Sequence, residues 1–159
     1  TRALGCYNIA NVHLPADQVS NSSNTKLLDR SIARKRELSA IICKLQHLEQ
    51  LQKQPSIPIV LGDFNNNMGD VAMKMLEASG FRPTWKDLKV DVSKEFTYNA
   101  LKPEQPNAGV IDHIFYNNLP RTKVIDGGII ELKKPLSDHK PVWAEIAFPQ
   151  VLKKLKPNN

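Results

Sequence analysis

The sequence predicts one domain built as a layered α/β or α+β sandwich. Short apolar runs typical of β-strands alternate with segments whose apolar residues recur at helical spacing, and strands dominate the end of the chain. The length of 159 residues is enough for a single domain that buries a core. We expect this domain to span residues 3–148 and a basic tail to follow at 149–159.

The first part of the chain predicts a strand, a loop and a helix. Residues 3–14 alternate so that Asn11 and His13 share one face of a strand, and the Pro-, Ser- and Asn-rich stretch 15–25 predicts a surface loop. The helix that follows ends at Pro55. Its apolar residues form one buried stripe, which consists of Leu38, Ile41, Ile42, Leu45, Leu48 and Leu51.

The middle of the chain predicts a strand, a short helix and a loop. Residues 57–61 are an almost wholly apolar run, typical of a strand covered on both faces. Residues 70–79 indicate a helix that stops at Gly80 and buries Val71, Met75 and Leu76. Residues 81–109 contain several prolines and few periodic apolar residues, so we expect a long, partly ordered loop there.

Three further strands are expected in the last third of the chain. They cover residues 110–116, residues 124–132 with a bend at Gly127-Gly128, and residues 142–148, where apolar side chains alternate cleanly.

Charge and cysteine content restrict the expected partners and the expected compartment. The net charge of +6 and the pI of about 9.4 favour polyanions such as nucleic acid or anionic lipid headgroups. No stretch approaches the ~20 apolar residues that cross a bilayer. Cys6 and Cys43 cannot form a disulfide framework, which slightly favours an intracellular setting. The start at Thr1 suggests a processed chain or a piece of a longer one and leaves export open, so the compartment is unassigned.

Three short polar motifs stand at the expected strand ends: Asn11-Val12-His13-Leu14, Gly62-Asp63-Phe64-Asn65 and Ser137-Asp138-His139. They fall on one rim of the sheets and supply two His, two Asp and two Asn. Metal-assisted phosphoryl hydrolysis needs this inventory: a base, charge-neutralising donors and a ligand for a hard cation.

Each motif also has a simpler interpretation. Asp63 and Asn65 could do no more than close an Asx-type turn, Asp138 and His139 could be ordinary turn residues, and His13 could be a hydrogen-bonded rim residue. Asp112 is more telling, because a carboxylate in an apolar strand should be paired, and a His is its natural partner. We interpret His47 and His113 as structural.

Other chemistries are disfavoured by the sequence. It has no glycine-rich phosphate loop with a Lys and no zinc-type Cys spacing. Neighbouring Ser137, Asp138 and His139 cannot form a Ser-His-Asp triad. The basic residues at the helix start, which include Arg34 and Arg36, could be a solvated face or could contact phosphates.

Taken in order, the three motifs and Ile111-Asp112-His113-Ile114-Phe115 resemble the endonuclease/exonuclease/phosphatase superfamily, which has the DNase I-like fold. The resemblance spans residues 8 to about 148. The superfamily includes abasic-site endonucleases, RNA deadenylases, neutral sphingomyelinases and inositol polyphosphate phosphatases.

The resemblance implies a role for each motif residue. His13 would contact the scissile phosphate, Asp63 would activate the attacking water, and Asn65 would help to hold the phosphate. Asp138 would be associated with the metal, His139 would face the phosphate, and Asp112 would orient His139. We add Asn11, Arg34 and Arg36 as candidate substrate-binding residues.

The chain also departs from the family pattern. Family members carry an Asn and then a metal-binding Glu in an N-terminal half, and no residue before His13 can replace that Glu. The resemblance therefore implies that only the C-terminal half of the fold is present. It also implies that the missing half is a partner, that an apolar face is left exposed, and that the chain alone is weak or inactive.

The leading hypothesis is a Mg²⁺-dependent phosphoester hydrolase, with Mn²⁺ as the other candidate ion, that acts on nucleic acid. One alternative from a different class is a non-catalytic nucleic-acid-binding module. Another is a phosphatase or sphingomyelinase of the same superfamily that acts on a phosphoinositide or sphingolipid.

Overall fold

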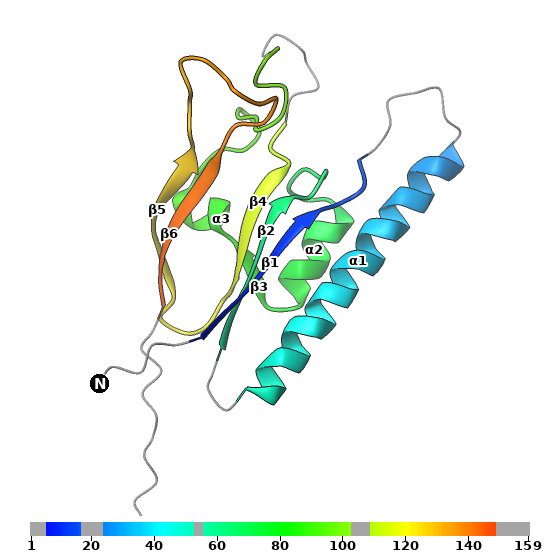
Figure 1. The fold of residues 1–159 in the computed structure, drawn as a ribbon, viewed down its shortest axis with the longest axis vertical. Helices are drawn as coiled ribbons and strands as arrows, with labels where there is room; N and C mark the ends of the chain where they lie inside the picture. The colour runs from blue at the N-terminus through cyan, green and yellow to red at the C-terminus, as the bar shows by residue number, and fades with distance from the viewer. Residues whose placement is uncertain (1–5, 17–23, 53–55, 103–108, 149–159) are drawn as a thin grey trace, which may run out of the picture.

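The structure is a computed structural model that describes residues 6–16, 24–52, 56–102 and 109–148. Its centre is a four-stranded sheet in the order β1-β2-β4-β3, and β5 and β6 form a second, two-stranded sheet. Helices α1 and α2 cover one face of the central sheet, and the β5–β6 pair lies on its other side (Figure 1). This arrangement confirms the predicted layered α/β class. The elements are β1 (Cys6–His13), α1 (Asn24–Leu51), β2 (Ser56–Asp63), α2 (Val71–Ala78), β3 (Phe81–Pro83), α3 (Thr84–Leu88), β4 (Asp112–Asn117), β5 (Lys123–Ile129) and β6 (Val142–Ala147).

The direction of the central strands brings three polar strand ends together. β1 and β2 are parallel, and β2 and β4 are antiparallel, so the ends of β1 and β2 lie beside the start of β4. His13 is in register with Asp63, and Asp63 is in register with Asp112. All three side chains therefore project from the same edge and the same face of the sheet.

The alternation expected for β1 is confirmed. Val12 and Leu14 are buried toward α1 and α2, whereas Asn11 and His13 are exposed on the opposite face. Tyr7 and Ile9 share that opposite face and are 53% and 62% exposed. An exposed apolar area therefore lies on β1, as the resemblance implied.

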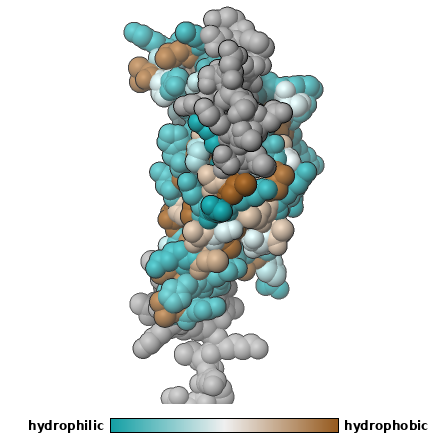
Figure 2. Space-filling model, turned by 90° about the vertical axis from the view of Figure 1, so that its right-hand side faces the viewer, coloured by the Kyte–Doolittle hydropathy of each residue, from teal (hydrophilic) through white to brown (hydrophobic). Residues whose placement is uncertain are grey.

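The core lies between the central sheet and the two long helices. Leu38, Ile42 and Leu45 of α1 pack with residues of β1, β2, β4 and α2. The predicted stripe of α1 is confirmed in its middle, while Leu51 at its end is exposed. On the α1 side of the molecule hydrophilic and hydrophobic residues are interspersed (Figure 2). Within the described residues, no helix is long and apolar enough to span a membrane.

The predicted long loop at 81–109 is wrong in its first part, which forms β3 and α3. Phe81 and Pro83 are buried where β3 pairs with β4, and Trp85 of α3 is buried as well. Elements of three and five residues are too short to show a periodic pattern, so their burial is a tertiary effect.

Two smaller expectations also need correction. α2 buries Ala72, Met73 and Leu76, whereas Val71 is exposed, because the first residue of the helix faces away from the core. β5 ends at Ile129 rather than at residue 132. Pro55 and the predicted basic tail at 149–159 lie outside the described residues.

Candidate functional site

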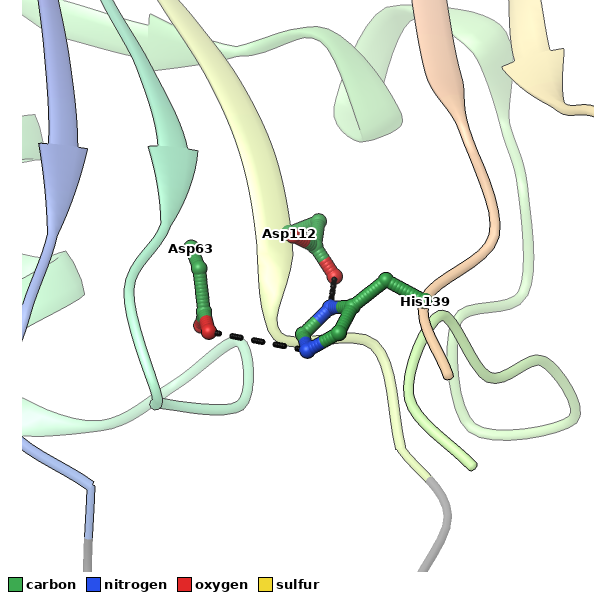
Figure 3. A group of neighbouring side chains, drawn as sticks. All are labelled: Asp63, Asp112 and His139. Atoms are coloured by element: carbon green, nitrogen blue, oxygen red, sulfur yellow. Dashed lines mark hydrogen bonds and ion pairs between the residues drawn. The ribbon is translucent and has the colours of Figure 1, made fainter. Parts of the chain in front are cut away.

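Asp63, Asp112 and His139 lie close together where strands β2 and β4 end and begin (Figure 3). Asp63 ends β2, Asp112 begins β4, and His139 comes from the loop that leads into β6. An isolated bridge between Tyr98 and His139 ties that loop to the segment after α3. Residues far apart in the sequence thus form one polar group.

The contacts within this group are specific. The His139 Nδ1 lies 2.8 Å from the Asp112 Oδ2, so the predicted contact between the two residues is confirmed. The other ring nitrogen, Nε2, faces the Asp63 Oδ2 at 3.8 Å. The His13 Nε2 lies 3.6 Å from the same carboxylate oxygen, and its side chain is 80% exposed. One carboxylate therefore lies between two imidazoles.

A tight turn sets the position of Asp63. The Asn65 backbone N–H donates to the Asp63 Oδ1 at 2.7 Å, which closes an Asx-type turn. The Asn65 side-chain amide donates to the Leu14 carbonyl at 2.7 Å and to the Asp63 Oδ2 at 3.2 Å. The expected Asx-type turn is thus present, and it links Asp63 to the end of β1.

Gly62 is required for this close approach. Its φ of +127° is a conformation that residues with a Cβ rarely adopt. An added Cβ would also lie 2.1 Å from the Val12 carbonyl oxygen. Only a glycine at this position lets β1 and β2 stay paired up to Asp63.

Thr97 holds the start of β4. Its side chain is fully buried, and its Oγ1 accepts the backbone N–H groups of Ile111 and Asp112 at 3.0 and 3.1 Å. The backbone of the same residue accepts the Lys140 N–H at 2.7 Å. Thr97 therefore connects the strand that bears Asp112 to the loop that bears His139.

Burial and charge shift the pKa of both reactive partners. Burial raises the pKa of Asp63, the Asn65 N–H opposes this, and the negative charge of Asp112 adds to it. Burial lowers the pKa of His139, but the hydrogen bond and the charge of Asp112, helped by Asp63 and Asp138, outweigh it, so the net shift is upward. The site thus favours a protonated imidazole beside a carboxylate that is a better base than usual.

Some predicted site residues lie outside this group. Asp138 is exposed, and its carboxylate accepts a hydrogen bond from the Ser137 hydroxyl at 3.3 Å. Asn11 lies on the same strand face as His13, with its side-chain oxygen close to Gly62. Arg36 is exposed on α1.

Arg34 does not lie on the surface, where it could contact a phosphate of the substrate. It is only 4% exposed, and its guanidinium donates to the Pro15 carbonyl at 2.8 Å. Arg30 similarly donates to the Ala16 carbonyl. These arginines hold the backbone that follows His13, so the expectation of Arg34 as an exposed substrate contact is corrected.

Of the two remaining histidines, His113 agrees with its structural interpretation. The Trp85 indole N–H donates to the His113 Nδ1 at 3.0 Å, so the opposite nitrogen carries the proton and donates to the Asn66 carbonyl at 2.8 Å. Burial lowers the pKa of His113, which keeps it neutral. His47 is exposed on α1.

Sequence reasoning missed Thr97 and Tyr98. The Tyr98 ring lies 5.1 Å from the His139 ring, centroid to centroid. Neither residue stands in an apolar pattern or a charged motif. Their role depends on contacts with residues 14 and 41 positions away in the chain, as the pairs Thr97–Ile111 and Tyr98–His139 show. A single sequence contains no signal for such contacts.

The donor atoms of the site can be compared with those that a divalent cation prefers. Among the described residues, Asp63, Asp112 and His139 offer two carboxylate oxygens and one imidazole nitrogen within 4.8 Å of one another. Oxygen and nitrogen donors of this type suit Mg²⁺ and Mn²⁺. A protonated His139 could not be a ligand, so the carboxylates are the better part of this set. The donor set therefore fits such an ion.

No protein-family model matches the chain, and no curated protein sequence matches it either. Solved structures do resemble it. A mannosyl-6-phosphatase from Bacteroides thetaiotaomicron is 20% identical, with a TM-score of 0.60, over 88% of this chain and 51% of the other.

Two further structures agree with the first. An endonuclease/exonuclease/phosphatase from Bacteroides vulgatus is 23% identical, with a TM-score of 0.60, over 75% of this chain and 45% of the other. The catalytic domain of human Nocturnin with bound sulfate is 23% identical, with a TM-score of 0.61, over 89% and 47%.

The chain thus has the α/β fold of endonuclease/exonuclease/phosphatase structures, and the resemblance seen in its motifs is confirmed at the level of the fold. It spans about half the length of the structures that it matches.

Proposed function

We propose that this chain contributes the phosphate-binding and water-activating residues of a metal-dependent phosphoester hydrolase of the endonuclease/exonuclease/phosphatase type. The observation that carries the proposal is the placement of the Asp63 carboxylate between His13 and a His139 that Asp112 holds. The similar structures include a mannosyl-6-phosphatase and an endonuclease/exonuclease/phosphatase, which supports the same class of chemistry.

Asp63 is the proposed general base. Its pKa is raised chiefly by burial, which brings its basicity closer to that needed to accept a proton from water. The Asn65 N–H and amide hold both carboxylate oxygens, so the base is oriented before substrate binds. Preorganisation of this kind lowers the cost of reaching the transition state.

His139 is the proposed donor to a non-bridging phosphoryl oxygen. Asp112 engages Nδ1, which leaves Nε2 to face the space beside Asp63. A protonated imidazole there stabilises negative charge as it develops on the phosphoryl oxygens. His13 faces the same space from β1 and would contact the phosphate from the solvent side.

A divalent cation, Mg²⁺ or Mn²⁺, is the proposed cofactor. Asp63 and Asp112 would hold it, and Asp138 stays a candidate from the family resemblance although it lies outside the group. When bound, such an ion neutralises charge on phosphoryl oxygens and lowers the pKa of water. As a further partner we propose the other half of the same fold, which would contribute the family's acidic metal ligand.

The test of this function is the Asp63→Asn variant of the full-length protein, by which we mean this chain together with the proposed other half of the fold. We expect its Mg²⁺-dependent hydrolysis of bis(p-nitrophenyl) phosphate to fall by roughly 10²- to 10⁴-fold, because the base is lost while its shape is kept. Asp126→Asn is the matched control, since Asp126 is exposed on β5 and accepts only the neighbouring Gly127 N–H among the described contacts.

The control should hydrolyse the diester at the wild-type rate. Equal activity of Asp63→Asn and wild type would reject Asp63 as the base. No activity in the wild type on any phosphoester, together with unimpaired nucleic-acid binding by both variants, would favour the binding-module alternative.

A further inference from the structure

A cavity of about 180 Å³ adjoins the candidate site. His139 lines one side of it, Phe96 and Ala100 come from the segment after α3, and Ile130 and Leu132 come from the loop between β5 and β6. That loop lies toward the same end of the molecule as the C-terminal ends of β1 and β2 (Figure 1). The cavity therefore opens beside the proposed phosphate position and not on a remote face.

Most of the residues that line the cavity are apolar, although polar atoms make up about half of its surface, and apart from His139 their charges balance. Its cation, Lys140, is largely covered, with the ammonium 3.3 Å from the centroid of the Phe96 ring. The same ammonium lies 2.6 Å from a Glu131 carboxylate oxygen, and Glu131 also lines the cavity. Because these two charges satisfy each other, a charged ligand group would gain little there and would lose its hydration.

The volume limits what the cavity can hold. Pockets that enclose whole drug-sized ligands measure about 300–1,000 Å³, so this cavity has room for one ring-sized group. Ile130 and Leu132 remain 41% and 42% exposed at its edge, which leaves apolar surface for such a group to cover.

We propose that this cavity is the subsite for the organic group next to the scissile phosphate, and that it selects an uncharged, ring-sized apolar group. The inference rests on the proposed function, because that function places the phosphate at His13, Asp63 and His139. Ile130 and Leu132 are then specificity-determining residues, and a phosphoester with a small alkyl group would leave the cavity unfilled.

Binding of two phosphonates to the full-length protein in the presence of Mg²⁺ tests the proposal. Phenylphosphonate fills both the phosphate position and the cavity, whereas methylphosphonate fills only the first. We expect calorimetry to show phenylphosphonate binding roughly 10-fold or more tightly, because filling an apolar pocket discriminates on this scale. Ile130→Ala should reduce that preference by roughly 3- to 10-fold, with Leu132→Ala as a second variant in the same direction.

Ile125→Ala is the matched control. Ile125 is the same residue type, is 55% exposed on β5, and does not line the cavity. It should keep the wild-type preference. Equal affinity for the two phosphonates, no binding of either, or a preference that Ile130→Ala and Leu132→Ala leave unchanged would overturn the proposal.

Hydrolysis of phenyl methyl phosphate, measured in parallel, separates this inference from the proposed function. Preferential phosphonate binding without hydrolysis would reject the hydrolase and keep the subsite. Hydrolysis without a preference for the ring would keep the hydrolase and reject the subsite.

Discussion

Asp112 and His139 form a pair in which each side chain depends on the other. The carboxylate sets the orientation of the imidazole through the 2.8 Å contact and outweighs the effect of burial on its pKa. Without Asp112, the burial that lowers the pKa of His139 would no longer be opposed by its strongest partner. We therefore expect substitution of Asp112 to change the pH dependence of activity. We also expect its effect on activity not to add to the effect of substituting His139.

The pH profile of kcat/KM should be bell-shaped in the full-length protein. Activity needs Asp63 ionised and His139 protonated, so the acid limb follows Asp63 and the alkaline limb follows His139. Asp112→Asn should move the alkaline limb to lower pH, since the group that raises the pKa of His139 is removed. The acid limb should also move down, because Asp112 raises the pKa of Asp63.

The same variants test whether the pair acts as a unit. Asp112→Asn should lower kcat/KM nearly as much as His139→Ala, and the double variant should be little worse than either. Losses that multiply, or an alkaline limb that stays in place in Asp112→Asn, would mean that the carboxylate does not act through the imidazole.

At the scale of elements, the segment after α3 is the connection that holds the site. Thr97 binds the start of β4 through its hydroxyl and the loop before β6 through its backbone. The site therefore depends on a part of the chain that bears none of the proposed catalytic side chains.

Thr97→Val should destabilise the protein by about 1–3 kcal/mol, because two buried N–H groups lose their acceptor while the shape of the side chain is kept. Thr84→Val is a close control: Thr84 is equally buried, and its hydroxyl has no hydrogen-bond partner among the described residues. Chemical denaturation should show a near-neutral effect for that control. Similar losses in both variants would assign the effect to the loss of a hydroxyl in general.

At the scale of the whole molecule, the distribution of charge bears on the proposed substrate class. The net charge of +6 favours a polyanion, and nucleic acid gains more from dispersed charge than a single headgroup does. Arg30 and Arg34 are engaged with backbone carbonyls, so Arg36 is the better-placed arginine of α1 for a phosphate contact.

We expect the full-length protein to bind and cleave oligonucleotides in preference to phosphoinositide or sphingomyelin vesicles across a salt series. Arg36→Gln should weaken oligonucleotide binding and reduce the salt slope by about one. Arg121→Gln is the control, since Arg121 is also exposed but follows β4 at the end away from Asp112. Preference for vesicles at low salt would reverse the choice of substrate.

The class of fold, most elements and the chemical inventory of the site can be predicted from the amino-acid sequence alone. Periodicity predicts β1, α1 and β2 because each buries a continuous face, and the polar motifs stand out at the strand ends where that burial stops. Pairing of Asp112 with a histidine was also predictable, since an isolated carboxylate in an apolar strand is costly.

Which side chains come into contact depends on segments that are distant in the chain. β3 and α3 are too short for a pattern, and their burial comes from β4, which pairs with β3 and whose His113 accepts a hydrogen bond from the buried Trp85 of α3. Arg34 is amphipathic and could have faced solvent, but the backbone after His13 supplies its acceptor. Thr97, Ile130 and Leu132 matter through contacts between segments distant in the chain. Local propensity acts over a few residues, whereas the site and its cavity exist only where the sheet register and the loops bring those segments together.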